Sequence, residues 1–317
     1  MLPRLKTIAL LGIGVLCAPA FGANPARPGT VNYVEGAAFL EGKQLNEKNV
    51  GSVDLNAGEV LSTTAGKAEV LLTPGVFLRL DDNSALKMVS PDITPTRVEL
   101  ERGRAALEVD ELYKQNDLEI VDAGVKTQVV KTGYYEFNAD NPTVEVFAGK
   151  AVVALGDGRY TVVKGHHELA LADGEMGKPV NFDARAAEDE LYNWSGLRSQ
   201  YLAEANNQIA GEYAGVSGFN PGWYWDPYMW DYTFIGMDPF WSPFGFGFYP
   251  PWMGGFYGGG FYGHRYYGRG FGGVGRGGLG GGGFHGGGGG FHGGGGGGFH
   301  GGGGGFHGGG GGGGGHR

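Results

Sequence analysis

The sequence predicts an all-β domain of the antiparallel sandwich or roll type, followed by one amphipathic helix and a glycine-rich tail. Three observations lead to this prediction. Short runs of alternating apolar and polar residues fill residues 31–171, and turn residues separate the later runs at intervals of 8 to 10 residues. The hydrophobic period lengthens to three or four over residues 184–209. Beyond residue 253 lie 41 of the 68 glycines. This stretch has too few apolar side chains to form a packed core.

Residues 1–22 have the layout of a secretory signal peptide. A basic start at Arg4 and Lys6 precedes an apolar run of 11 residues, and small residues follow it up to Gly22. A membrane-spanning helix needs roughly 20 apolar residues, so we expect no permanent transmembrane span. We expect an exported protein, periplasmic or extracellular, cleaved after Gly22 or else after Ala20. Cleavage would remove the single cysteine, and with it any disulfide.

The first pair of predicted strands lies in residues 68–80. Pro74 and Gly75 supply the turn between two runs of strand-forming residues. In an extended chain, every second side chain points to the same face. One face of this pair therefore collects Val70, Leu72, Val76, Leu78 and Leu80, and we expect it to form part of the core.

A second pair of strands is predicted at residues 98–110, with its turn at Gly103. Apolar residues alternate with acids here, so the residues expected to face solvent are Glu99, Glu101, Glu108 and Asp110. Further strands are expected at residues 118–121, 125–130, 143–147, 151–155, 160–163 and 169–171. Turns are expected to begin at Asp122, Thr132, Asp140, Ala148, Gly156, Lys164 and Asp173. A short β-solenoid is the alternative, although the units share no residue pattern.

Several motifs in this region resemble the FecR-type domain, a β-rich periplasmic module. The first block reads LNAGEVLST from Leu55, GKAEVLL from Gly66 and LRLDDNSAL from Leu78, similar to the family's glycine-acid turn and the two strands that follow it. A later block, VEVFAGKAVV from Val144, is similar to the family's strand-glycine-strand hairpin. Where the family has a Gly-Thr-x-Phe segment, this chain reads TGYYEF. The resemblance covers residues 31–175.

The resemblance implies a fold and a compartment but no reaction, because its motifs are turns and core positions. The family's namesake carries a cytoplasmic segment and a membrane helix, and it passes an iron-uptake signal to a sigma factor. Only six residues precede the apolar run of this chain. We therefore do not expect the sigma-factor activity here.

Residues 184–210 are expected to form the amphipathic helix, with Asp183 as its N-cap. Its apolar stripe, spaced at three, four or seven residues, contains Ala187, Leu191, Trp194, Tyr201, Ala205 and Ile209. Packing against the β domain is the favoured interpretation of this stripe. A docking or dimerisation surface is the alternative.

Residues 219–253 form a Trp-, Tyr- and Pro-rich segment, in which repeated prolines exclude long helices and central strands. Trp and Tyr are rigid, amphipathic contact residues, suited to sugar rings or partner chains. The segment either packs on the domain or presents an interaction surface, and the sequence leaves both open. The candidate interaction residues are Trp223, Trp225, Trp230, Trp241 and Trp252.

Residues 254–317 are expected to be disordered, since glycine loses the most backbone freedom on folding. A histidine follows a phenylalanine four times, at His285, His292, His300 and His307. Neutral imidazole binds Zn, Cu or Ni, and glycine spacers would let several rings reach one ion. Such binding would be weak, because no second shell orients the rings. The alternative is a spacer or adhesive tail without a cofactor.

The sequence contains no familiar catalytic motif, so we expect a protein that is not an enzyme. Adjacent histidines, His166 and His167, fit a turn or a strand end better than a shared metal site. Asp81 and Asp82 fit a solvent-exposed turn.

All 33 acidic residues lie between Glu35 and Asp238, and this acidic body argues against nucleic-acid binding. These features favour a non-enzymatic binding or scaffold module of the cell envelope. Its partner would be an envelope protein or a polysaccharide. Metal binding or metal sensing through the tail histidines is the alternative function.

Overall fold

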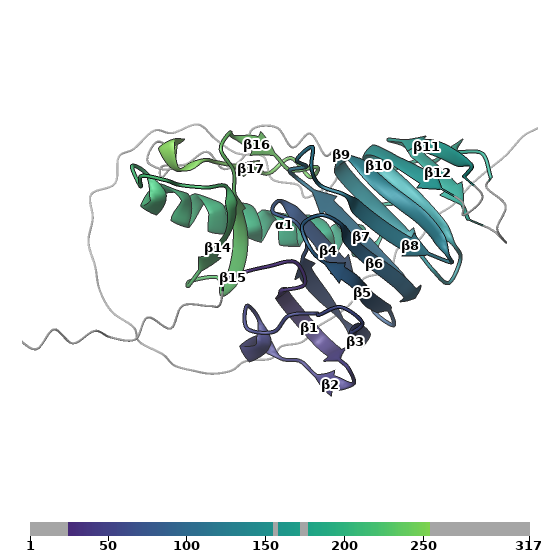
Figure 1. The fold of residues 1–317 in the computed structure, drawn as a ribbon, viewed down its shortest axis with the longest axis horizontal. Coiled ribbons are helices and arrows are strands. Elements are labelled where there is room, and N and C mark those ends of the chain that lie inside the picture. Colours follow the sequence, from purple (N-terminus) through teal and green to yellow (C-terminus); the bar gives the residue numbers. More distant parts are fainter. Residues whose placement is uncertain (1–24, 155–157, 172–176, 254–317) are drawn as a thin grey trace, which may run out of the picture. The chain divides into compact units, whose positions relative to one another are not determined.

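The structure is a computed structural model that describes residues 25–154, 158–171 and 177–253 (Figure 1). All of these residues fall within one compact unit. The predicted signal peptide, residues 1–22, and the glycine-rich tail, residues 254–317, lie outside the described residues. The turns expected at Gly156 and Asp173 lie outside them as well.

A 13-stranded sheet dominates the fold, which confirms the predicted all-β sandwich or roll. Seven of its strands are, in spatial order, β9 (Val125–Asn138), β7 (Arg104–Val109), β4 (Val76–Leu80), β3 (Val60–Leu71), β5 (Ala85–Pro91), β6 (Thr96–Arg102) and β8 (Leu118–Asp122). The sheet closes into a roll, because β9 pairs with β7 through one half and with β8 through the other. Only β6 and β8 pair in parallel among these described strands. This arrangement differs from the alternative, a short β-solenoid, because neighbouring strands are mostly antiparallel and several of the pairs do not follow one another in the chain.

Six further strands extend the sheet. β1 (Val31–Leu40) pairs with β3 and, at its end, with β2 (Lys43–Gln44); the 3-10 helix η1 (Glu47–Asn49) follows. On the other side, β10 (Thr143–Ala154) pairs with β9 and also with β11 (Tyr160–Lys164) and β12 (His167–Ala170). β12 in turn pairs with β13 (Val180–Asn181).

The turns predicted at Thr132 and Ala148 are wrong, because β9 and β10 continue through both positions as bulged strands. Their pairing register shifts around Gly133 (φ +156°) and Gly149 (φ +108°). A Cβ on Gly133 would lie 2.0 Å from the carbonyl oxygen of Ala148. Glycine therefore lets the two strands stay paired through a bulge, where a side chain would force them apart.

The inner face of the roll holds the main apolar core. The apolar face predicted for the first strand pair is confirmed, because the buried cluster contains Val70, Leu72, Val76, Leu78 and Leu80. The apolar positions of the second pair join the same cluster. They are Val98, Leu100, Ala105, Leu107 and Val109.

The outer face of β3, β4 and β7 is not exposed, which overturns the prediction that Glu108 and Asp110 face solvent. Glu69, Arg79 and Glu108 are fully buried, and Asp110 is nearly so. Phe77 lies on this face and packs in a second apolar cluster with residues from the C-terminal part of the chain. The acids alternate with apolar residues as expected, but a second layer covers them.

That layer is the C-terminal cover, defined here as residues 189–253, which lies against the sheet (Figure 1). Its elements are α1 (Glu190–Ile209), η3 (Ala210–Tyr213), the hairpin β14 (Gly222–Asp226) with β15 (Asp231–Ile235), the hairpin β16 (Phe240–Trp241) with β17 (Gly247–Phe248), and η4 (Pro251–Met253). The helix packs on the domain, in agreement with the favoured interpretation. Within the described residues, none of the helices combines the length and the apolar character needed to cross a membrane.

The helix begins later than predicted. Asp183 accepts a hydrogen bond from the backbone N–H of Arg185 at 3.1 Å, yet only a turn follows. Asp189 instead caps α1, accepting from the backbone N–H of Tyr192 at 3.1 Å. Asp189 also pairs with Arg104 on the sheet, and this tertiary contact fixes where the helix can begin.

The buried face of α1 also differs from the predicted stripe. Tyr201 is exposed, whereas Arg198 and Asn206 are buried. Leu191, Ala205 and Ile209 are buried as predicted. The helix meets a charged face of the sheet, so polar side chains share the contact with apolar ones.

Candidate functional site

A buried ion network joins the cover to the outer face of the sheet. Arg79 on β4 pairs with Glu69 on β3, with 2.8 Å between Nε and Oε2, and with Glu108 on β7. Arg198 of α1 reaches the other oxygen of Glu69 at 3.0 Å and Asp231 of β15 at 2.9 Å. All five side chains are at most 5% exposed. Charged groups from three strands, the helix and a hairpin thus meet in one dry interface.

Neutral groups complete this network. Asn32 of β1 donates to Glu69 at 2.9 Å and to the carbonyl of Tyr232 at 3.0 Å, and it accepts from the N–H of Tyr232 at 2.7 Å. Ser199 of α1 donates to Glu108. The guanidinium of Arg198 lies 4.1 Å from the ring centre of Tyr33. These contacts fix α1 and β15 in one position on the sheet.

The network contains more carboxyl groups than guanidinium groups. Burial tends to raise the pKa of Glu69, but the charges of Arg198 and Arg79 outweigh it and lower that pKa. Burial raises the pKa of Asp231 to about 7, against the opposing charge of Arg198. It also raises the pKa of Glu108. These acids are shielded from solvent and lie between the sheet and the cover.

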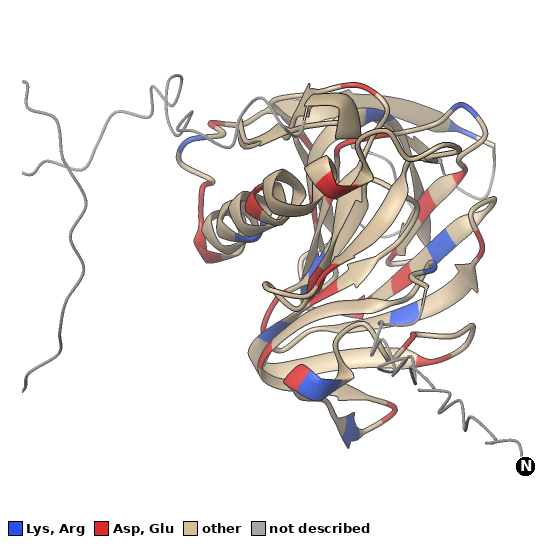
Figure 2. Cartoon of the chain, turned by 90° about the vertical axis from the view of Figure 1, so that its left-hand side faces the viewer, with Lys and Arg blue, Asp and Glu red and all other residues tan. Residues whose placement is uncertain are grey.

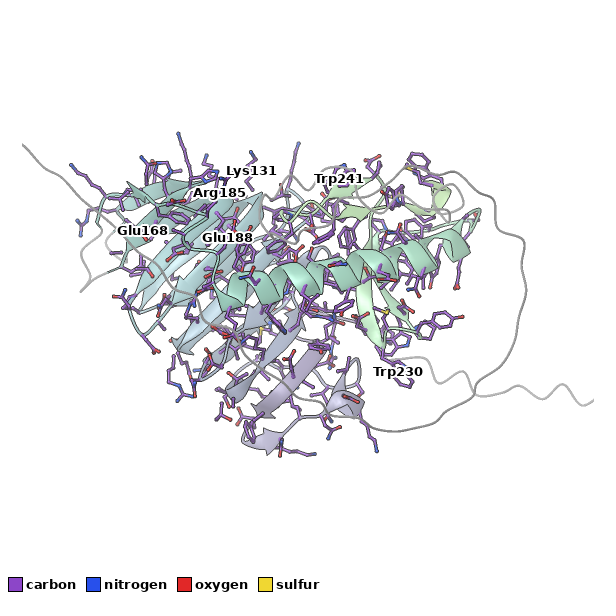
Figure 3. The ribbon with its side chains drawn as sticks, turned by 180° about the vertical axis from the view of Figure 1, so that it is seen from behind. Lys131, Glu168, Arg185, Glu188, Trp230 and Trp241 are labelled. Carbon is purple, nitrogen blue, oxygen red and sulfur yellow. The ribbon has the colours of Figure 1, made fainter. Side chains whose placement is uncertain are left out.

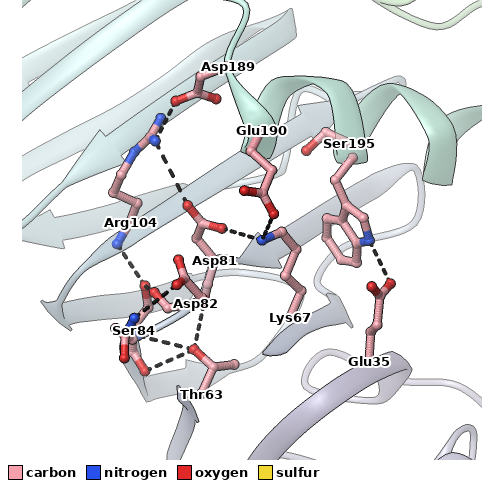
Figure 4. A network of polar contacts seen from close by, with 12 residues as sticks. Glu35, Thr63, Lys67, Asp81, Asp82, Ser84, Arg104, Asp189, Glu190 and Ser195 are labelled. Carbon is pink, nitrogen blue, oxygen red and sulfur yellow. Dashed lines mark hydrogen bonds and ion pairs between the residues drawn. The ribbon is translucent and has the colours of Figure 1, made fainter. Parts of the chain in front are cut away.

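A second polar cluster lies at the start of α1 (Figure 4). Arg104 pairs there with Glu136 and with Asp189. Lys67 pairs with Asp81 at 2.8 Å and with Glu190 of α1 at 3.0 Å. Asp81 is therefore buried and ion-paired, which corrects its predicted place in an exposed turn.

A cavity of about 310 Å³ opens beside this cluster. Burial raises the pKa of Glu136 to about 7, although the charge of Arg104 opposes it. Since Arg104 is already paired with three carboxylates, those of Glu136, Asp189 and Asp81, the cavity presents no free cation to an anionic substrate. Its lining is Arg104, Glu136, Phe137, Asn138, Thr143, Glu145, Ala186, Ala187 and Asp189.

The five candidate tryptophans divide into two groups. Trp223 packs against Phe77 with ring centres 4.9 Å apart, and Trp225 lies against Gly51 beyond the end of η1, where a Cβ would come within 2.6 Å of the indole. The others reach solvent. Their exposed fractions are 71% for Trp230, 70% for Trp241 and 62% for Trp252.

Trp230 and Trp241 lie well apart on the cover (Figure 3). Trp252 donates through its indole N–H to the carbonyl of Met237 at 3.2 Å. Exposed tryptophan is uncommon in a folded protein. Some rings of the segment thus pack on the domain and others face solvent, and the interaction role of the exposed rings stays a prediction.

Residues 227–230, the aromatic tip, connect β14 to β15. Tyr228 is 74% exposed, and its N–H donates to the carboxylate of Asp226 at 2.8 Å. The N–H of Trp230 donates to the carbonyl of Asp226 at 2.9 Å. Trp230 has φ +57°, a left-handed conformation that costs a bulky residue about 1–3 kcal/mol. The indole of Trp225 meets Trp230 edge to face at 6.1 Å.

The histidines do not form a metal site in the part of the chain that the structure describes. His166 occupies a turn with φ +63°, and His167 begins β12, as predicted. Nδ1 of His167 lies 2.9 Å from the carbonyl oxygen of Gly165. No group of three or more His, Cys, Asp or Glu side chains there is arranged to hold a metal ion. The predicted ligands His285, His292, His300 and His307 lie outside the described residues.

The buried network was not predicted from the sequence, although one signal for it was present. Glu69 shares its face of β3 with Leu71, and Arg79 shares its face of β4 with Phe77. Large apolar residues next to charges on a supposedly solvated face indicate that something covers that face. Nothing in the local pattern identified Arg198 as the residue that meets them.

Known proteins support the predicted resemblance. The sequence model of the family described as FecR protein matches residues 58–152. Two crystal structures of a "putative anti-sigma factor" from Parabacteroides distasonis ATCC 8503 are similar, at 16% and 17% sequence identity and a TM-score of 0.35 each. Each similarity covers 40% of this chain and 62% of the other, so the chain spans less than two thirds of those proteins. No curated protein matches the chain.

Proposed function

We propose that this chain, which carries a FecR domain at residues 58–152, is a non-enzymatic binding or scaffold module of the cell envelope. The C-terminal cover supplies its contact surface. The observation that carries this proposal is the exposure of Trp230, Trp241 and Trp252, at 62–71%, on a layer that is fixed to the domain.

The cover is a firm support for such rings. Its helix and first hairpin are bound to the sheet by Arg198, which pairs with Glu69 and Asp231. Asn206 adds hydrogen bonds to the carbonyls of Phe234 and Tyr249, at 3.0 and 3.1 Å. A rigid aromatic side chain loses little conformational entropy when it binds, which favours affinity.

The polar clusters support binding rather than catalysis. Glu69, Arg79 and Glu108 are closed off beneath α1, so no substrate reaches them. Arg104, beside the cavity, is neutralised by its three acidic partners. We also propose that the protein is exported to the periplasm or the cell exterior and that residues 1–22 are removed during export.

Capture from envelope extracts tests the contact surface. The tagged full chain would be compared with the triple variant Trp230→Ala, Trp241→Ala, Trp252→Ala. We expect the variant to retain less than a tenth of the captured material while keeping its thermal unfolding midpoint. The matched control is Tyr160→Ala, because Tyr160 is an equally exposed ring on β11, at 71%, outside the cover. Equal capture by the triple variant and the wild type would overturn the proposal.

A second function, metal binding through His285, His292, His300 and His307, is favoured by the regular Phe-His pairs on glycine spacers. Metal binding by the tail and partner binding by the cover would be separate functions, since the tail and the cover share no residues.

A further inference from the structure

We infer that the aromatic tip, residues 227–230, binds a neutral polysaccharide by stacking Trp230 and Tyr228 on its sugar rings. This inference rests on the proposed binding function, because it names the partner class for one part of the same surface.

The charge of residues 219–253 points to an uncharged partner. Residues 219–253 contain no Lys or Arg, whereas Lys and Arg lie on the strands of the sheet and on α1 (Figure 2). Two of the three acids in this segment, Asp226 and Asp231, are buried, which leaves Asp238 as its exposed acid. A surface without cations has nothing to pair with phosphate, sulfate or carboxylate groups. The acidic remainder of the body would also repel an anionic chain.

The backbone holds Trp230 ready for contact. Its left-handed φ of +57° is a conformation that glycine adopts freely and a bulky residue adopts at a cost. Asp226 holds the loop through the N–H groups of Tyr228 and Trp230, and Arg198 holds Asp231 at the end of the loop. Strain retained at an exposed site indicates that the side chain there is used.

Rings of this kind suit sugars. The face of an indole or phenol ring packs against the apolar face of a pyranose. The indole N–H of Trp230 and the phenol O–H of Tyr228 can then reach hydroxyl groups at the edge of the sugar.

The size of the tip argues against a protein partner. A stable protein interface covers about 800 Å² on each side, and a loop of four residues with two exposed rings is much smaller. Trp241 lies too far away to enlarge the patch (Figure 3). A sugar chain needs only one or two stacked rings at each contact, and its repeating units offer the tip many equivalent places to bind.

Native gel electrophoresis of the full chain tests this inference. The test gels contain a neutral polymer, which is β-1,3-glucan, dextran or hydroxyethyl cellulose. The control gels contain anionic alginate or no polymer. We expect at least one neutral polymer to retard the protein and alginate not to do so.

Trp230→Gly separates binding from folding, because glycine relieves the left-handed strain. That variant should unfold at the same or a higher temperature and bind at least tenfold more weakly. Trp230→Phe, which keeps a ring, should stay within about threefold of the wild type, as should the Tyr160→Ala control.

Absence of retardation by every neutral polymer, or equal retardation of Trp230→Gly, would overturn the inference. Envelope capture separates this failure from failure of the proposed function. Capture that depends on Trp230 and survives protease treatment of the extract supports the polysaccharide. Trp230-dependent capture that protease abolishes would identify a protein partner, so the inference would fall while the binding function stood. Capture that depends on none of the exposed tryptophans would overturn both.

Discussion

The two faces of the sheet are packed by different chemistry. Inside the roll, aliphatic side chains such as Leu72 and Leu78 fill the core without polar partners. On the outer face, Glu69 and Arg79 are equally buried, but each is matched to particular groups of the cover. Apolar packing tolerates exchange of one side chain for another of similar volume. Paired charges allow only one position of the covering layer, because any shift leaves a buried charge without its partner.

This difference suggests that the cover belongs to the folded domain in this chain. The family match ends at residue 152, whereas the buried network depends on Arg198 and Asp231. Without the cover, Glu69, Arg79 and Phe77 would face solvent.

The largest effect is expected at the centre of the outer network. Arg79→Ala should lower the free energy of unfolding by about 3–5 kcal/mol, because it leaves Glu108 buried without a counter-charge and leaves Glu69 with Arg198 alone. Leu78→Ala, on the inner face of the same strand, should cost a similar 2–5 kcal/mol through loss of packing. Urea unfolding measures both.

Arg102→Ala is the control for this experiment, since Arg102 is exposed and should contribute less than about 0.5 kcal/mol. A cost below about 1 kcal/mol for Arg79→Ala would show that the outer face packs like an ordinary surface.

The two faces should also differ in their response to pH. Asp231 keeps its proton in the folded protein up to a pKa of about 7, raised from 3.8, whereas the unfolded chain loses that proton near pH 4. The contribution of Asp231 to the free energy of unfolding should therefore fall by about 4 kcal/mol as pH rises from about 4 to about 7, and level off above. Asp231→Asn should flatten this slope in unfolding curves measured at several pH values. The same slope in the variant would assign the effect to other acids, and Asp238→Asn serves as the exposed control.

A smaller effect is expected where α1 meets β1. Trp194 is half-buried, and its indole N–H donates to Glu35 at 3.0 Å. Trp194→Ala should cost about 1–2 kcal/mol, between the values for a core residue and a surface residue. Tyr201→Ala, two turns further along the helix and exposed, should cost less than about 0.5 kcal/mol. A reversed order in thermal unfolding would show that Tyr201, and not Trp194, packs against the domain.

The smallest effect on the body is expected from the tail. The quadruple variant His285→Ala, His292→Ala, His300→Ala, His307→Ala should leave unfolding of the domain unchanged. Calorimetric titration with Zn should show weak binding at pH 7.5 that fades below about pH 6.5, because only neutral imidazole is a ligand. Equal binding by wild type and variant at pH 7.5 would reject the metal function.

Local patterns predicted the inner face well. Alternation identified Val70 and Leu72 as core residues, and the proline-glycine pair placed the turn between β3 and β4. The same reasoning failed at Thr132 and Ala148, where glycine next to polar residues signals a turn or a bulge equally well. Only the strand paired alongside decides between the two.

The candidate surface was predicted in part. The aromatic segment stood out by composition, but composition does not separate Trp225, which lies against Gly51, from Trp230, which faces solvent. That separation depends on which loop lies next to each ring. Such neighbours come from distant parts of the chain, and a local pattern carries no information about them.

What the sequence by itself determined is the set of features that arise within a few residues: strand alternation, the family motifs, a helix-forming stretch and an aromatic segment without cations. Only the tertiary structure decided which face of α1 is buried and whether Glu108 is a surface acid or a buried one. The physical reason is that a charge on a strand is stable either in water or beside a buried partner. The partners of Glu108 are Arg79 and Ser199, and Ser199 comes from a helix that begins more than 80 residues later in the chain.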